Sequence, residues 1–128
     1  MSDDLAAEWR QGRLDLIQNL VPAKNAQEVT ITLSRTFASL TTDQRVELEP
    51  LLREWLRSDD ESDRFDAIAI VRDNDVTSMI PDLRELQDRL EDSTEVGAPY
   101  EWAKVNRVLG HLVSVATAAS DLTSESES

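Results

Sequence analysis

The chain has 128 residues, a length that suits one domain built around a single hydrophobic core. It has no cysteine and one histidine, His111, so disulfides, thiolate metal sites and zinc sites with several histidines are excluded. The formal net charge of −13 disfavours nucleic acid and anionic membranes as partners and attracts basic proteins, although solubility or a salt-adapted host explains the same charge.

The chain lacks the sequence features of a membrane or secreted protein. No apolar run approaches the roughly 20 residues that a membrane-spanning helix needs. The first four residues, Met-Ser-Asp-Asp, do not resemble a signal peptide. We therefore expect a cytoplasmic protein with no membrane partner.

Apolar residues at helical spacing predict two helices in the first third of the chain. The first is expected over about 3–21, where Pro22 ends it. The second is expected over about 25–40. Its beginning, 29–33, also alternates as a strand would, but the later apolar residues keep the helical period, which favours a helix.

The next two predicted helices enclose an acidic turn. Thr41, followed by Gln44 three residues later, has the pattern of a capping box and opens a helix over about 42–57. The turn at 58–62 contains Asp60 and Ser62, either of which suits the N-cap of a helix over about 62–73. That helix is apolar nearly all round, which predicts a central position covered on several sides.

Arg64 falls within the apolar arc of this helix. Because a buried arginine needs a partner, we expect Arg64 to be buried and hydrogen-bonded to an aspartate of the preceding turn, Asp59 or Asp60.

The last two predicted helices cover about 76–91 and 98–118. Asp75 or Ser78 is expected to open the first of them, and Pro99 suits the first position of the second. From residue 119 the chain is polar and acidic and too poor in apolar residues to pack. We therefore expect a single helical domain over 1–118, followed by a disordered acidic tail over 119–128.

A proline-led segment occurs twice. Pro50-Leu-Leu-Arg-Glu-Trp-Leu and Pro81-Asp-Leu-Arg-Glu-Leu-Gln match at the proline, the third-position leucine and the Arg-Glu pair, and the prolines are 31 residues apart (81 − 50). That spacing is close to one helix-turn-helix repeat. Short connections favour antiparallel neighbours, so the fold class expected is all-α, with three antiparallel helical hairpins stacked as a short α-solenoid.

The middle hairpin resembles a HEAT repeat. Pro50 in its first helix, Asp59 or Asp60 in its turn and Arg64 early in its second helix stand in the order of that family's motif. The second copy keeps Pro81 but has Glu95 where the arginine is expected, so the resemblance covers 42–118, and 1–40 only by periodicity. It implies an Asp–Arg bridge between repeats and a protein-binding scaffold, adaptor or inhibitor.

No recognisable constellation for catalysis or metal binding is present. The acidic cluster at 59–63 fails as a calcium loop, because Arg64 stands where the loop needs glycine and Ile70 where it needs glutamate. There is no glycine-rich phosphate loop, and His111 with Ser114 is an unsupported pair. We therefore expect no enzyme activity, no cofactor and no metal.

One face of the last predicted helix differs from the rest of this acidic chain. It gathers an aromatic residue and cations at helical spacing, opposite the apolar stripe: Tyr100, Lys104, Arg107 and His111, here named the cationic strip. Such residue types are enriched at binding hot spots, although an ordinary solvated face fits too. The expected function is a non-enzymatic protein-binding module that uses this strip. The alternative is an immunity-type inhibitor whose acidic surface covers a basic toxin.

Overall fold

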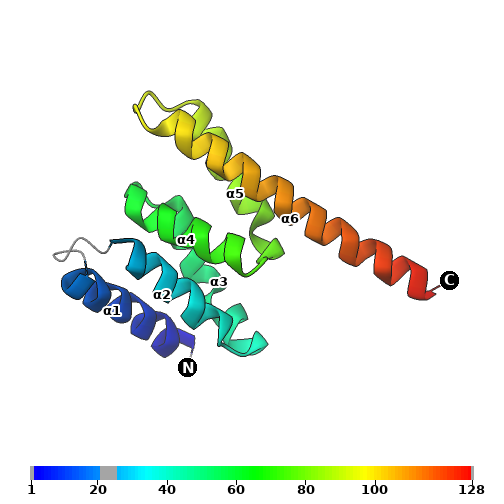
Figure 1. Cartoon of the computed structure of the whole chain (residues 1–128), viewed down its shortest axis with the longest axis horizontal. Coiled ribbons are helices and arrows are strands. Elements are labelled where there is room, and N and C mark those ends of the chain that lie inside the picture. Colours follow the sequence, from blue (N-terminus) through cyan, green and yellow to red (C-terminus); the bar gives the residue numbers. More distant parts are fainter. Residues whose placement is uncertain (1, 21–25, 128) are drawn as a thin grey trace. The chain divides into compact units, whose positions relative to one another are not determined.

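The structure, a computed structural model, describes residues 2–20 and 26–127, with side chains for 5–18 and 28–119, and the regular secondary structure in these residues is helical. In those ranges there is no strand, which confirms the all-α class and the helical assignment of 29–33. The described part of the chain contains six α-helices and one 3-10 helix (Figure 1): α1 Ser2–Leu20, α2 Ala26–Ala38, α3 Thr42–Arg57, α4 Glu61–Asp73, η1 Thr77–Met79, α5 Ile80–Glu91 and α6 Ala98–Glu127.

The helices form two compact units, Met1–Asn74 and Asp75–Ser128. The sequence predicts a single domain over 1–118, and this stays a prediction. Each unit is therefore described by itself.

In the first unit, α1 packs against α2 and α3, and both α2 and α3 pack against α4. Figure 1 shows α1 and α2 side by side. Neighbouring helices in the chain thus form two hairpins, and helices of like position in the hairpins also touch. The buried apolar side chains come from all four helices: Trp9, Val29, Leu33, Phe37, Leu48, Leu51, Leu52, Trp55, Leu56, Ala67, Ile68, Ala69, Ile70 and Val71.

The predicted caps of α3 and α4 are confirmed. The Gln44 N–H donates to Thr41 Oγ1 at 3.2 Å, and the Thr41 N–H donates to Gln44 Oε1 at 3.0 Å, which completes the capping box. Asp60 is the N-cap of α4, and its Oδ1 accepts from the Ser62 N–H at 2.9 Å. Only three residues, 58–60, connect the two helices, so they pack as antiparallel neighbours.

Helix α4 differs from the expectation of an apolar surface nearly all round. Phe65 is 44% exposed, whereas Asp66 is 5% exposed. The period of the helix turns Asp66 toward α1 and α2, where Arg13 and Thr30 satisfy its carboxylate. The Asp66 carboxylate, with its hydrogen-bond partners, is therefore buried at a position where the composition of the helix predicts an apolar side chain.

Arg64 is buried, at 7% exposure, as predicted. Its Nη1 donates to the Ser58 carbonyl oxygen at 3.0 Å, at the C-cap of α3. Its charge also contributes to lowering the pKa of Asp60, after the hydrogen bonds from Ser62. Arg64 thus joins the end of α3 to the start of α4, while its hydrogen bond to an aspartate stays a prediction.

The second unit contains η1 and the α5–α6 hairpin, whose members pack against one another. Neither Asp75 nor Ser78 caps α5; Met79 precedes that helix without a side-chain cap, and Pro81 lies in its first turn. Asp75 has a φ of 51°, in the left-handed region, and its carboxylate faces His111 instead. The buried side chains of this unit are Met79, Leu83, Leu86, Leu90, Ala98, Val105, Val108, Leu109 and Leu112.

Helix α6 is much longer than its hairpin partner and continues past α5 to Glu127 (Figure 1). It therefore passes the boundary expected near 118, and its backbone is helical in most of the segment predicted as a disordered tail. Side chains from 120 onward lie outside those described, and the tail's lack of packing stays a prediction. No helix among the described residues is long and apolar enough to cross a membrane.

The two proline-led segments agree in burial but not in helix position. At the shared offset of 31, Leu52 and Leu83 are both buried, as are Trp55 and Leu86. Pro50, however, lies inside α3, whereas Pro81 lies in the first turn of α5. The common pattern therefore reflects the same apolar face on two helices that start at different points.

Candidate functional site

The cationic strip lies along the first half of α6. Tyr100 is 81% exposed, and Arg107 and His111 are exposed as well, whereas Lys104 is partly buried. The opposite face of α6 packs in the unit through Val105, Leu109 and Leu112. The helix thus brings the four residues onto one outward face, because they recur every three or four positions.

His111 of the strip forms a hydrogen bond with Asp75. Its Nε2 lies 2.7 Å from Asp75 Oδ1, and both side chains are about half exposed (51% and 49%). When the imidazole is protonated, this contact is an ion pair; when it is neutral, the ring still donates if Nε2 carries the proton. Asp75 therefore partly neutralises the C-terminal end of the strip.

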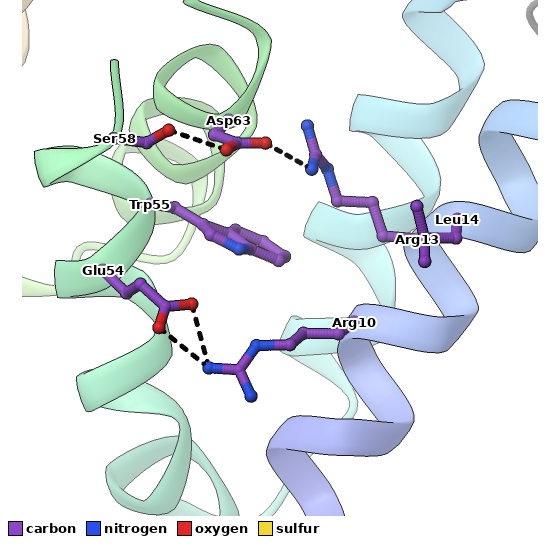
Figure 2. Close-up of a pocket in the computed structure, with 7 residues that line it drawn as sticks. All are labelled: Arg10, Arg13, Leu14, Glu54, Trp55, Ser58 and Asp63. Atoms are coloured by element: carbon purple, nitrogen blue, oxygen red, sulfur yellow. Dashed lines mark hydrogen bonds and ion pairs between the residues drawn. The ribbon is translucent and has the colours of Figure 1, made fainter. Parts of the chain in front are cut away.

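A second feature, which the sequence did not indicate, is an open groove in the first unit. Its volume is about 410 Å³, and it lies between α1 and the α3–α4 hairpin (Figure 2). Trp55 forms an apolar wall, and Leu14, 51% exposed, stands at the rim. Charged side chains complete the lining: Arg10, Arg13, Glu54 and Asp63, together with Ser58.

Arg13 anchors the deep side of the groove through two carboxylates. Its Nε donates to Asp66 Oδ2 at 2.7 Å and its Nη1 to Asp63 Oδ1 at 2.6 Å. The guanidinium also lies over the Trp55 ring, 5.0 Å from its centroid. Thr30 Oγ1 donates to the other oxygen of Asp66 at 2.7 Å. Arg13 therefore joins α1 to α3 and α4, and Asp66 links α4 to α2 through Thr30.

The electrostatics of Arg13 follow from these contacts. Burial favours the neutral form, but the hydrogen bonds and negative charges of Asp66 and Asp63 outweigh it and raise the pKa of Arg13. The guanidinium therefore stays charged in a site that is only 8% exposed. Its Nη2 is buried and has no hydrogen-bond partner among the described residues.

Arg10 forms the outer counterpart of this anchor. Its Nη2 donates to both carboxylate oxygens of Glu54, at 3.0 and 2.9 Å, and the two side chains are half exposed (50% and 58%). Figure 2 shows this pair on the opposite side of the Trp55 ring from the Arg13–Asp63 pair. Two arginines and two carboxylates line the groove, so the lining carries no net charge.

The chemistry of the groove is that of a structural junction. The Ser58 hydroxyl donates to Asp63 Oδ2 at 2.8 Å and accepts from the Asp60 N–H at 3.0 Å, so it completes the α3–α4 turn. Glu54 forms an ion pair with Arg10, and Asp63 forms an ion pair with Arg13, so both carboxylates of the groove are paired. Among the described residues, no group of three or more histidines, aspartates or glutamates is placed to hold a metal ion.

Comparison with protein-family models, with curated proteins and with solved structures found no match to this chain.

The sequence did contain a signal for Arg13. Arg13 follows Trp9 by four residues and precedes Leu16 by three, which places it on the apolar face of α1. The same reasoning that singled out Arg64 applies to it. The sequence could not show which carboxylate pairs with Arg13, because Asp66 is 53 residues away in the chain.

Proposed function

We propose that this protein is a non-enzymatic helical module that binds another protein, as a scaffold or adaptor. One observation carries the proposal: the face of α6 that contains the cationic strip is turned outward, with Tyr100 81% exposed, on a chain whose net charge is −13. Tyrosine and arginine contribute large contact area and directional hydrogen bonds, and both are enriched in binding hot spots.

The packing of the first unit supports a HEAT-like arrangement. Consecutive repeats of a solenoid place each helix against its counterpart in the next repeat. Here α1 packs against α3 and α2 packs against α4. Arg64 is buried at the α3–α4 turn, where the resemblance places its arginine. The α5–α6 hairpin of the second unit is a further helical hairpin, and one broad side of α6 is left for a partner.

The strip defines the chemistry of the partner. Lys104, Arg107 and protonated His111 favour a surface rich in aspartate or glutamate, while Tyr100 offers an apolar ring with a hydroxyl at its tip. Attraction of this kind speeds association and weakens as salt is added. Nucleic acid and membranes are not expected as partners, and a cytoplasmic location stays a prediction.

A pull-down from native cells followed by titration calorimetry tests the proposal. Lys104→Glu with Arg107→Glu should weaken binding of the captured protein at least about tenfold, because like charges then face each other. The matched control is Arg35→Glu with Arg84→Glu, the same charge change at two exposed positions outside the strip. Equal loss of affinity in both double variants, or no loss in either, would remove the strip from consideration.

A second candidate is an immunity-type inhibitor that covers a basic toxin. The observation in its favour is the α3–α4 turn, where Asp59, Asp60 and Glu61 are exposed and Phe65, on the first turns of α4, is 44% exposed. An apolar ring bordered by carboxylates suits a basic target. In that case Glu61→Lys with Phe65→Ala should abolish binding of the captured protein, whereas the strip variant should bind as wild type does.

A further inference from the structure

The outward side of α2 combines both signs of charge with an exposed apolar side chain. Glu28 and Arg35 are exposed, Ile31 is 39% exposed, and Thr32 is partly exposed; these four residues are here named the α2 face. The buried residues of α2 all lie on the opposite side: Val29, Thr30, Leu33, Ser34 and Phe37. Helix α2 therefore has one side that packs on α1 and α4 and one side that is uncovered.

The two charges of the α2 face are available to a partner. Among the described residues, the side chain of neither Glu28 nor Arg35 forms a hydrogen bond or an ion pair. Glu28 lies in the first turn of α2 and Arg35 in the last, where each complements the helix dipole. Residues 29–42 contain no aspartate or glutamate, so beyond its first turn α2 has no acid that would repel a second copy of this acidic chain.

The helical period aligns Glu28 with Arg35. They are seven positions apart (35 − 28), which is about 10 Å along the axis and within about 20° of the same direction. Ile31 and Thr32 lie at the midpoint between them, one on each side of the line that joins the two charges. A carboxylate and a guanidinium are thus placed at equal distances from the centre of the α2 face.

We propose that the α2 face pairs with the α2 face of a second copy of the chain, in an antiparallel arrangement about a two-fold axis between residues 31 and 32. In this register Glu28 lies opposite Arg35 of the second copy, and symmetry repeats the contact, as an isologous interface requires. Ile31 lies beside its own counterpart at the centre, where its exposed apolar surface is removed from water. The proposal goes beyond the proposed function, because it concerns the first unit and no residue of the cationic strip.

The direction of pairing follows from the charges. A parallel pair would set Glu28 against Glu28 and Arg35 against Arg35, which like-charge repulsion disfavours. The antiparallel pair opposes unlike charges at both ends and also sets the two helix dipoles in opposite directions. One acid and one cation give the α2 face no net charge, so two copies of a chain with a net charge of −13 meet here without further repulsion at the contact.

The pair is expected to be weak and reversible. Helix α2 has 13 residues and is about 20 Å long, so a seam along it buries less area than a standard stable interface. At about 0.15 M salt, repulsion beyond a Debye length of about 8 Å is screened, whereas opposed charges in contact still attract. The dimer should therefore form in such salt at high protein concentration and dissociate on dilution.

Single cysteines test the register, because the natural chain has no cysteine. Thr32→Cys places a thiol about 1.5 Å along the axis from its own counterpart, whereas Ser39→Cys, at an exposed position of the same chain segment, places it about 22 Å away. Oxidation with copper phenanthroline at about 1 mM chain should link the Thr32→Cys variant into disulfide-bonded dimers at least about tenfold faster than the Ser39→Cys variant. Equal rates would overturn the proposal.

Charge exchange gives an independent test by sedimentation velocity of the full chain. Glu28→Arg and Arg35→Glu, each alone, should lower the association constant at least about tenfold, because each sets like charges opposite one another. The double variant should restore association, since it exchanges the two charges of the same contact. The matched control is Asp43→Arg, which removes an exposed acid from the first turn of α3 and should leave the dimer intact. Circular dichroism checks that each variant keeps its helix content.

A wild-type chain that sediments as a monomer at about 1 mM excludes the pairing, and a folded double variant that fails to recover excludes the opposed charges. The strip variant, Lys104→Glu with Arg107→Glu, should still form the dimer, because the strip lies outside the α2 face. Loss of the dimer in that variant would place the contact on α6 instead. Calorimetry at the strip uses dilute, monomeric chain, so Arg35→Glu remains a valid part of the control for that experiment.

Discussion

At the scale of single residues, Arg13 is the side chain on which the first unit depends. It is 8% exposed, and it contacts Asp66, Asp63 and the Trp55 ring at once. Removing one member of a buried ion pair strands the other charge in a low-dielectric site, which costs more than the pair itself contributes. These contacts predict that removing Arg13 alone lowers the stability more than replacing Arg13 and Asp66 together.

Arg13→Ala is expected to lower the free energy of unfolding by about 3–5 kcal/mol, because Asp66 would remain buried without its cation. Urea denaturation, monitored by tryptophan fluorescence, measures this change in the free energy of unfolding. The matched control is Arg10→Ala on the same helix, whose pair with Glu54 is half exposed; this should cost less than about 1 kcal/mol. Equal losses in the two variants would contradict the assignment of Arg13 as the buried anchor.

Replacing both charged residues separates the contribution of the ion pair from the cost of burying one charge without its partner. Arg13→Met with Asp66→Leu removes the stranded charge as well as the bridge, so we expect most of the stability lost in Arg13→Ala to return. The same urea titration checks this. A double variant as unstable as Arg13→Ala would mean that the hydrogen bond to Thr30, or the shape of the site, matters more than the charge.

At the scale of elements, helix boundaries are where local sequence chemistry decides the outcome. Thr41 and Gln44 form the predicted capping box, and Asp60 caps α4. Asp60 accepts hydrogen bonds from the hydroxyl and the N–H of Ser62, and these lower its pKa. Its ionised form is therefore favoured in the folded state over the unfolded state.

The cap gives a prediction with a defined pH dependence. A carboxyl whose pKa is lowered on folding stabilises the protein above its unfolded pKa, and this contribution disappears as pH falls through about 4 and below. Asp60→Ala should cost about 0.5–2 kcal/mol at neutral pH. Asp60→Asn, which can still accept the hydrogen bonds, should lose less and should show a flatter acid limb. Chemical denaturation between pH 7 and about 3 measures both.

Local patterns and long-range contacts explain which parts of the fold the sequence could predict. The helices, the caps and the burial of Arg64 depend on residues within a few positions of one another, so periodicity and cap chemistry indicate them. The contact between Arg13 and Asp66 and the groove beside Trp55 depend on packing between α1, α3 and α4. No local sequence pattern predicts such a contact, although the position of Arg13 on an apolar face indicates that this arginine needs a partner.

Asp75 shows why the start of α5 differed from the prediction. An aspartate before an apolar stripe is a common N-cap, but here its φ of 51° and its contact with His111 use both its backbone and its carboxylate for the turn. Its partner lies 36 residues later in the chain. The long-range contact therefore outweighs the local preference, and α5 starts from η1 instead.

At the scale of the whole molecule, the contacts divide the chain at Asn74 and Asp75 into a four-helix unit and a helical hairpin. Four helices can enclose a core with members on several sides, whereas two helices cover each other on one side only. We therefore expect a fragment of residues 1–74 to be helical and to unfold cooperatively, and a fragment of residues 75–128 to be much less stable by itself. Circular dichroism during thermal unfolding of the two fragments tests this expectation.

Removing the end of α6 tests whether this segment contributes to stability. The segment 120–128 is polar, so its deletion should leave the melting temperature unchanged. Differential scanning calorimetry of the full chain and of the shortened chain measures the effect. A lowered melting temperature would show that the segment packs against its own chain.

The energetic independence of the two units can be measured with Arg13. Its partners, Asp66, Asp63 and Trp55, all lie within residues 1–74. If that unit folds by itself, Arg13→Ala should cost the same free energy of unfolding in the fragment as in the full chain, because contacts in separate units contribute additively. Urea denaturation of four proteins, wild type and variant in both lengths, completes the cycle. A difference above about 0.5 kcal/mol between the two costs would mean that the hairpin of α5 and α6 stabilises the first unit and that the chain unfolds as one domain.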